Sequence, residues 1–175
     1  MTSEEIAVIQ VGPNLDFEIQ TLPATLLDKF PDVNTTLLQP LENVHEAFNS
    51  KRKQYHSTRL IAMLESRIHQ NQKIMGITSL DLYNPGMDGR GFIFGEARCP
   101  GHAGIVSTAR LRTNVDERGT FEERVRKEVV HEIGHMIGLN HCTTAFCVMK
   151  RSTNMRDTDK KTDKFCEKCQ TELRK

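Results

Sequence analysis

The sequence HEIGHMIGLNHC, residues 131–142, places three histidines, a glutamate, two glycines and a cysteine in twelve consecutive positions. His131 and His135 are four residues apart, so their side chains would lie within about 40° of each other on an α-helix. Two imidazoles one turn apart can bind one zinc ion. The opposite face of the same helix is apolar and includes Val125, Val129, Ile133 and Met136. The stretch predicts a helix with one core face and one metal-binding face.

His141 follows six residues after His135 and would point about 240° away if the helix continued. The helix must therefore end between them. Gly138 is the expected end, because glycine readily adopts the left-handed conformation that terminates helices. Three neutral imidazoles leave one zinc position open, which is typical of catalytic rather than structural sites.

A water on such a zinc ion has a pKa of about 7 and needs a proton acceptor beside it. Glu132 projects from the same turn as His131, and we predict that it is the general base and the proton donor to the leaving amine. A surface ion-pair partner is the alternative for Glu132. Glu128, one turn upstream, either orients a ligand or, as we expect, is a solvated helix charge.

Four cysteines near the end of the chain have a spacing close to that of structural zinc sites. They are Cys142, Cys147, Cys166 and Cys169. Four thiolates fill the coordination sphere, and binding would supply on the order of 10 kcal/mol toward folding. Disulfides are the alternative. The start MTSEEIAVIQVG lacks the basic region and cleavage site of a secretory signal, so we expect a cytoplasmic protein with reduced thiols. Cys99 is expected to be a small, buried or half-buried residue.

Composition places the chain among ordinary globular proteins. It has 175 residues, 37% hydrophobic and 27% charged, with a net charge of +1. That length suits one domain with a hydrophobic core. The low net charge gives no general attraction to nucleic acid or to an anionic membrane, and no apolar run approaches the roughly 20 residues of a membrane span.

Hydrophobic patterns predict alternating strands and helices through the first two thirds of the chain. The predicted strands are residues 6–12, 33–41, 73–82, 91–97 and 104–111. The predicted helices are residues 15–30, 44–70 and a long helix that carries His131 and His135. Thr120 is its expected N-cap, since Glu123 follows three residues later as in a capping box. Residues 150–164 read as a polar, irregular connector.

The histidine pattern, followed by Cys142, Cys147-Val148-Met149 and Cys166-x2-Cys169, resembles the archaemetzincin family of metzincin-clan zinc metallopeptidases. The resemblance extends upstream to GITSLDLY, residues 76–83, and to GFIFGEA, residues 91–97. It implies an α+β, zincin-like metzincin fold, in which a twisted mixed β-sheet carries backing and active-site helices. It also implies one catalytic domain, residues 1–175. Residues 1–138 would form the upper subdomain, and residues 139–175 a small lower subdomain bound to zinc.

The resemblance further implies two zinc ions, and its residues carry over one by one. The catalytic ion would lie on His131, His135 and His141, with Glu132 as base. The structural ion would lie on Cys142, Cys147, Cys166 and Cys169. Met149 would form the floor of the site without ligating, and a peptide or protein substrate would pair with an edge strand near Phe92–Ala97.

Two features depart from the pattern. Sixteen residues separate Met149 and Cys166 where we expect 17, which a polar loop tolerates. Both tyrosines, Tyr55 and Tyr83, precede the metal motif, so the tyrosine that some metzincins place after this methionine is absent. The group that stabilises the oxyanion is therefore unassigned.

The sequence predicts a monomeric zinc metallopeptidase. The alternative is an inactive zinc-binding module that recognises peptides, but Glu132 and all three histidines are retained. A nucleic-acid-binding zinc finger is a further alternative, because residues 150–164 are rich in lysine and arginine. Asp157, Asp159 and Asp163 dilute that charge, so we predict no nucleic-acid partner.

Overall fold

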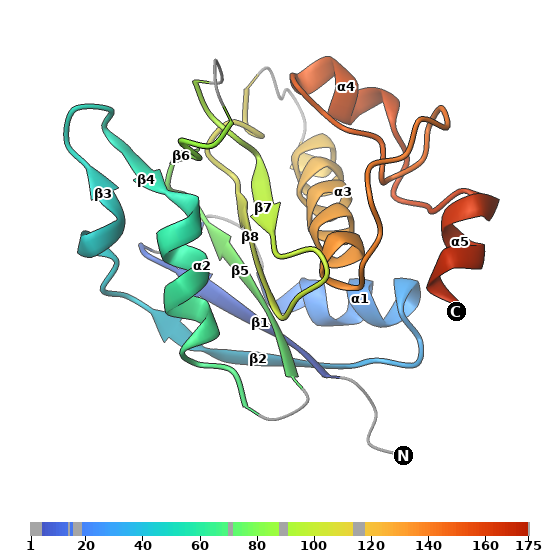
Figure 1. Ribbon diagram of the computed structural model, residues 1–175, viewed down its shortest axis with the longest axis horizontal. Coiled ribbons are helices and arrows are strands. Elements are labelled where there is room, and N and C mark those ends of the chain that lie inside the picture. The colour runs from blue at the N-terminus through green and yellow to red at the C-terminus, as the bar shows by residue number, and fades with distance from the viewer. Residues whose placement is uncertain are drawn as a thin grey trace.

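A five-stranded mixed sheet forms the centre of the molecule (Figure 1). The computed structural model describes residues 5–13, 15, 19–69, 72–87, 91–113 and 118–174. The strand order is β2 (Asn34–Leu41), β1 (Glu5–Val11), β5 (Gln72–Thr78), β8 (Ala103–Ser107) and β7 (Gly95–Ala97). The first four strands are parallel, and β7 lies antiparallel to β8 at the edge. The α+β class and the mixed sheet predicted from the sequence are confirmed.

Helices cover both faces of this sheet, which explains why its central strands read as unbroken apolar runs. On one face, Ile6, Val8 and Met75 pack with α1 (Leu22–Lys29) and α3 (Arg118–Met136). On the other face, alternate residues such as Ala7, Ile9 and Ile74 pack with α2 (Ser57–Glu65). Figure 1 shows α2 on the opposite side of the sheet from α1 and α3.

The helix that carries the histidines is present as α3, and its predicted apolar face is buried against the sheet. The predicted N-cap was wrong: α3 begins at Arg118, so Thr120 lies inside the helix. The predicted helix 15–30 is shorter than expected. Within its described part, a 3-10 turn (η1, Ile19–Thr21) precedes α1, and residues 16–18 lie outside the described residues.

The predicted helix 44–70 was wrong in its first half. Residues 44–56 instead contain a 3-10 turn (η2, His45–Ala47) and the hairpin strands β3 (Phe48–Asn49) and β4 (Gln54–His56). Asn49 Oδ1 accepts hydrogen bonds from the backbone N–H groups of Lys51 and Arg52, a local turn that competes with helix. Lys53 closes the turn with a φ of 55°. Residue 70 lies outside the described part.

The predicted strands 6–12 and 33–41 agree with β1 and β2 to within one residue, whereas the three later strand predictions were right in place and too long in extent. Residues 73–82 split into β5 and β6 (Leu82–Tyr83), which pairs with β4 in a second sheet. Only Gly95–Ala97 of the predicted strand 91–97 and Ala103–Ser107 of 104–111 form strands. The connector contains α4 (Met155–Lys160), and α5 (Glu167–Leu173) ends the described chain. Across the described residues, no helix is long and apolar enough to cross a membrane.

Candidate metal centres and active site

The three histidines meet at the C-terminal end of α3. Nε2 of His135 lies 3.2 Å from Nε2 of His131 and 3.3 Å from Nε2 of His141. Nδ1 of His131 donates to the carbonyl of Val148, and Nδ1 of His135 to that of Leu139, each at 2.7 Å. These bonds place the protons on Nδ1, so unprotonated Nε2 atoms face one another. Acceptors at such distances repel unless a cation lies between them.

The geometry also fits zinc in size. Zinc–nitrogen bonds of about 2.1 Å at tetrahedral angles separate two nitrogens by about 3.4 Å. Burial lowers the pKa of His131 well below its usual value, and the nearby charge of Lys161 lowers it further. Burial also lowers the pKa of His135. Both imidazoles are therefore held neutral, which is the form that binds a metal.

The turn after α3 brings His141 back to the other two histidines, as predicted. Gly138 has a φ of 108°, and its N–H donates to the carbonyl of His135. The next N–H, of Leu139, reaches back to the carbonyl of Gly134 at 2.9 Å, which closes the helix end. The predicted break at Gly138 is confirmed.

Glu132 is buried where α3 meets the edge strand β7. A Cβ on Gly95 would stand 2.7 Å from Glu132 Oε1, so the absence of a side chain at Gly95 leaves room for this carboxylate. Burial raises the pKa of Glu132 well above its usual value, and the charge of Glu128 raises it further. Glu132 is thus a proton acceptor with raised basicity that lines the same cavities as the histidines.

The prediction that Glu128 is a solvated charge was wrong. Glu128 is 3% exposed, and its Oε1 lies 3.0 Å from Nζ of the equally buried Lys161. The same oxygen accepts hydrogen bonds from the hydroxyls of Thr158 and Ser152. The alternation of charge and apolar residues on α3 gave no sign of this pair, because Lys161 comes from the distant connector.

The four predicted cysteines also gather into one cluster. Sγ of Cys142 lies 3.7 Å from that of Cys166, and Sγ of Cys147 lies 3.8 Å from that of Cys169. Zinc–sulfur bonds of about 2.3 Å in a tetrahedron separate sulfurs by about 3.8 Å, whereas a disulfide needs about 2.0 Å. The disulfide alternative therefore fails: the described cysteines are free thiols.

Backbone groups make the cysteine cluster suitable for thiolates. The backbone N–H of Thr144 donates to Sγ of Cys142, and that of Cys166 donates to Sγ of Cys147. Hydrogen bonding from the Cys169 backbone lowers the pKa of Cys166 to about 6. Burial raises the pKa of Cys147 and of Cys169, a cost that a bound cation would offset.

One short turn connects the two clusters. The N–H of Cys142 donates to the carbonyl of Met149 at 2.9 Å. The carbonyl of the preceding residue, Val148, holds His131 Nδ1. Met149 is fully buried against α3, where a Cβ on Gly134 would come within 2.4 Å of its sulfur. Met149, which was predicted to form the floor of the histidine site, therefore packs against Gly134 of α3, between His131 and His135 in the sequence.

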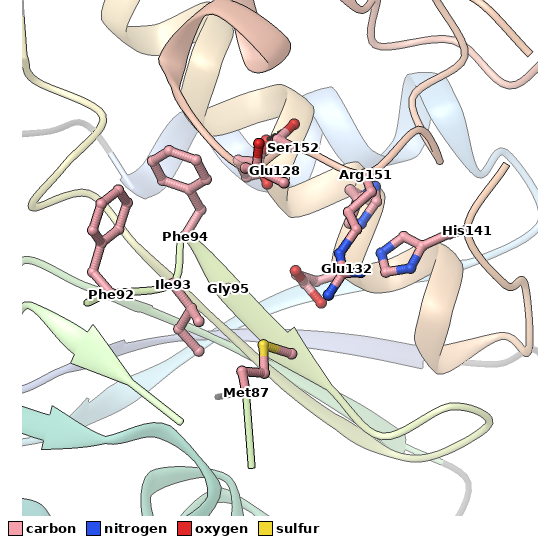
Figure 2. A pocket seen from close by; sticks show the side chains of 12 residues that line it. Met87, Phe92, Ile93, Phe94, Gly95, Glu128, Glu132, His141, Arg151 and Ser152 are labelled. Carbon is pink, nitrogen blue, oxygen red and sulfur yellow. Dashed lines mark hydrogen bonds between the residues drawn. The ribbon is translucent and has the colours of Figure 1, made fainter. Parts of the chain in front are cut away.

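Two cavities meet at the histidines. The first, about 50 Å³ in volume, includes Phe92, Phe94, Glu128, Arg151 and Ser152 in its lining (Figure 2). The second, about 280 Å³, has Glu96, Ala97, Cys99 and Asn140 among the residues that line it. Both share His131, Glu132 and His141. The site is therefore an open junction between two compartments.

Two residues differ from expectation or were not foreseen. Cys99 is exposed, not buried, and lies in the second cavity. Arg151 lines the first cavity and was not foreseen as a site residue. Its place two residues after Met149 could have indicated that it lies near the histidines, but the sequence analysis treated it only as part of a basic connector.

Comparisons with known proteins agree with this geometry. The sequence model of peptidase family M54 matches residues 21–175. An archaemetzincin from Methanopyrus kandleri is 42% identical over 127 residues, which cover 73% of this chain and 69% of that protein. One from Archaeoglobus fulgidus is 40% identical over 129 residues, 74% of each chain.

Solved structures show the same likeness in three dimensions. The crystal structure of the Methanopyrus kandleri archaemetzincin superposes with a TM-score of 0.87 at 29% identity, covering 98% of this chain and 93% of that one. That of the Archaeoglobus fulgidus archaemetzincin gives 0.82 at 30% identity, with coverages of 95% and 98%. The histidine cluster, the cysteine cluster and these matches lead to one conclusion: the chain belongs to peptidase family M54, with the archaemetzincins, and is a zinc metallopeptidase.

Proposed function

We propose that His131, His135 and His141 hold the catalytic zinc ion and that Glu132 is the general base for peptide-bond hydrolysis. The observation that carries this proposal is the convergence of three Nε2 atoms beside a buried carboxylate, with those of His131 and His135 left unprotonated by their Nδ1 hydrogen bonds. A zinc ion held there would polarise the scissile carbonyl and acidify a water molecule.

The protein's own residues would perform the proton transfers. Glu132 accepts a proton from the attacking water and passes it to the leaving amine. Its raised pKa suits both steps, since a carboxylate made more basic by burial takes up a proton more readily. Nδ1 hydrogen bonds to Val148 and Leu139 keep the imidazoles in one tautomer and one orientation.

We assign the four cysteines to a second, structural zinc ion. Four thiolates leave no open position, so this ion would not take part in hydrolysis. Its role would be to hold residues 139–175 as a small lower subdomain beneath residues 1–138, the two parts forming one monomeric catalytic domain of the metzincin type. The connector between the cysteine pairs is rich in charge and needs such an anchor.

A peptide substrate would add to the sheet at β7. No strand in the described residues pairs with the outer edge of β7, and Gly95 of this strand touches Glu132. Main-chain hydrogen bonds to an edge strand fix an extended peptide with little demand on its sequence. The natural substrate would then be selected by the cavities on either side of the histidines.

The test combines metal content with cleavage of a peptide library. We expect two zinc ions per chain in the wild type and in Glu132→Ala, and cleavage by the wild type alone. Cleavage that survives in Glu132→Ala would refute the role given to Glu132. Two bound zinc ions with no cleavage by either protein would favour the inactive peptide-binding module.

A further inference from the structure

The first cavity joins an apolar wall to one exposed cation. Its wall is formed by Phe92, Ile93 and Phe94, and Arg151 faces it from the segment after Met149. Figure 2 shows the Arg151 side chain reaching into the space beside Glu132 and His141. We propose that this cavity, in the peptidase function proposed above, receives an aspartate or glutamate side chain directly after the scissile bond and that Arg151 recognises its carboxylate.

The position of the cavity along β7 sets the position in the substrate. Phe94, just before β7, lines the first cavity, Gly95 at the start of β7 lines both, and Glu96 and Ala97 line the second. We take the peptide to pair antiparallel with β7, the orientation in which β8 pairs with its other edge, so the peptide runs from the second cavity toward the first. Because the histidines and Glu132 lie where the cavities meet, the side chain that enters the first cavity belongs to the residue after the cleaved bond.

The floor of the cavity does not offset the charge of Arg151. Glu128 is the carboxylate there, and its Oε1 already lies against Nζ of Lys161 and receives the hydroxyls of Thr158 and Ser152. A buried, neutralised pair of this kind leaves little net charge. Arg151 is exposed and is the one lysine or arginine among the described residues that line the cavity.

The remaining carboxylate, Glu132, lies at the junction of the two cavities. A divalent cation bound to the three histidines would lie beside Glu132. Its charge of +2 would outweigh the charge of −1 on this carboxylate. The site as a whole is therefore positive toward an incoming side chain, and a guanidinium group suits a carboxylate in both charge and planar shape.

The floor of the cavity favours an acidic side chain over a basic one. The cavity has a volume of about 50 Å³, and the Glu128 carboxylate at its floor is already paired with Lys161. In the wild type, an arginine or lysine side chain that entered would have to displace Lys161 to gain an ion pair with Glu128.

The experiment uses zinc-loaded full-length protein and two peptidyl hydroxamates, which bind metallopeptidases without being cleaved. They differ only in the side chain that follows the metal-binding group, which is that of aspartate in one and asparagine in the other. Calorimetry should show roughly tenfold tighter binding of the aspartate compound to the wild type, as for a hydrogen bond between charged groups. Arg151→Met should bind both equally, and Arg151→Glu should bind a third compound, with lysine in the same position, more tightly than either.

Lys150→Met is the matched control, because Lys150 is exposed beside Arg151 but does not line the cavity. It should keep the aspartate preference. Equal binding of the two compounds to the wild type, or a preference that persists in Arg151→Met, would overturn the proposal. The hydroxamate measurement requires no cleavage, so a protein that discriminates the compounds but cuts no peptide would refute the peptidase function while upholding the pocket. For peptides that are cleaved, kcat/KM with aspartate directly after the scissile bond should be compared with kcat/KM with asparagine there. The ratio of the two should follow the same order across these variants as the ratio of the binding affinities.

Discussion

The carboxylate of Glu132 lies directly against Gly95, so that a Cβ on this glycine would stand 2.7 Å from Oε1 and 2.8 Å from Cγ. The same Cβ would meet the backbone carbonyl of Ile105 at 2.9 Å, which cannot move away without disturbing β8. The proposed base and the proposed peptide-binding strand are therefore one packed unit.

Gly95→Ala should consequently displace Glu132. We expect kcat/KM to fall roughly 100-fold, the effect of moving a catalytic group by about 1 Å. Metal content, measured by mass spectrometry, should stay unchanged because the three atoms nearest a Cβ at Gly95 belong to Glu132 and Ile105 and not to a histidine. Gly91→Ala is the control, since a Cβ there meets nothing within 4 Å. Full activity in Gly95→Ala would show that the position of Glu132 is not limiting.

The buried Glu128–Lys161 pair should behave as a unit in folding. Nζ of Lys161 lies 3.0 Å from Oε1 of Glu128 and forms an ion pair with it. This contact does not have the angles of a hydrogen bond, and Nζ has no hydrogen-bond partner in the described structure. Lys161→Met or Glu128→Gln alone should reduce the free energy of unfolding by about 3–5 kcal/mol, because one buried charge is left unpaired. The double variant should lose less than the sum, as measured by urea unfolding.

Lys160→Met is a suitable comparison for the pair, because Lys160 is exposed and adjacent in sequence. It should change the free energy of unfolding by less than about 0.5 kcal/mol. Strictly additive losses in the double variant would mean that the two side chains do not interact.

Asp163 should make stability depend on pH in the acid range. Burial acts to raise its pKa, but Lys29 and Arg126, at 3.1 and 3.0 Å, outweigh that effect and hold the pKa below its usual value. The stabilisation is therefore complete above the unfolded-state pKa of about 3.9 and is lost as the pH falls through the folded-state pKa. Asp163→Asn should remove this part of the pH dependence of unfolding, whereas Asn at the exposed Asp32 should leave it in place.

Cys142→Ser should weaken both metal sites. The substitution removes one thiolate from the cysteine cluster. Cys142 directly follows His141, and its backbone N–H donates to the carbonyl of Met149. A disturbance of the cysteine cluster would therefore reach the third histidine. We expect loss of stability and roughly tenfold weaker zinc binding at the histidines, the usual effect of disturbing what orients a ligand. Zinc titration by competition with a chelator measures this. Cys99→Ser should leave the zinc affinity of the histidine site unchanged. An unchanged affinity of this site in Cys142→Ser would show that the two metal centres are independent of each other.

Sequence reasoning succeeded where a short-range rule applied. The offset between His135 and His141 required a helix end, and Gly138 provides it with a φ of 108°. The spacing in the sequence also predicted that the three histidines and the four cysteines gather into two clusters. It failed where a local side chain or a distant segment decided the outcome: the turn at Asn49 replaced a helix, and Lys161, 33 residues after Glu128, turned an expected surface charge into a buried pair.

The edge strand β7 carries a risk for the protein as a whole. An unpaired strand edge that can accept a peptide can also accept the same strand of another molecule, which leads to aggregation. β7 spans only three residues, Gly95–Ala97, and Glu96 at its centre is charged and tied by hydrogen bonds to Thr58 and Asn84. Such a short edge with a fixed charge admits a flexible peptide for a few residues but gives a folded sheet too little length to polymerise.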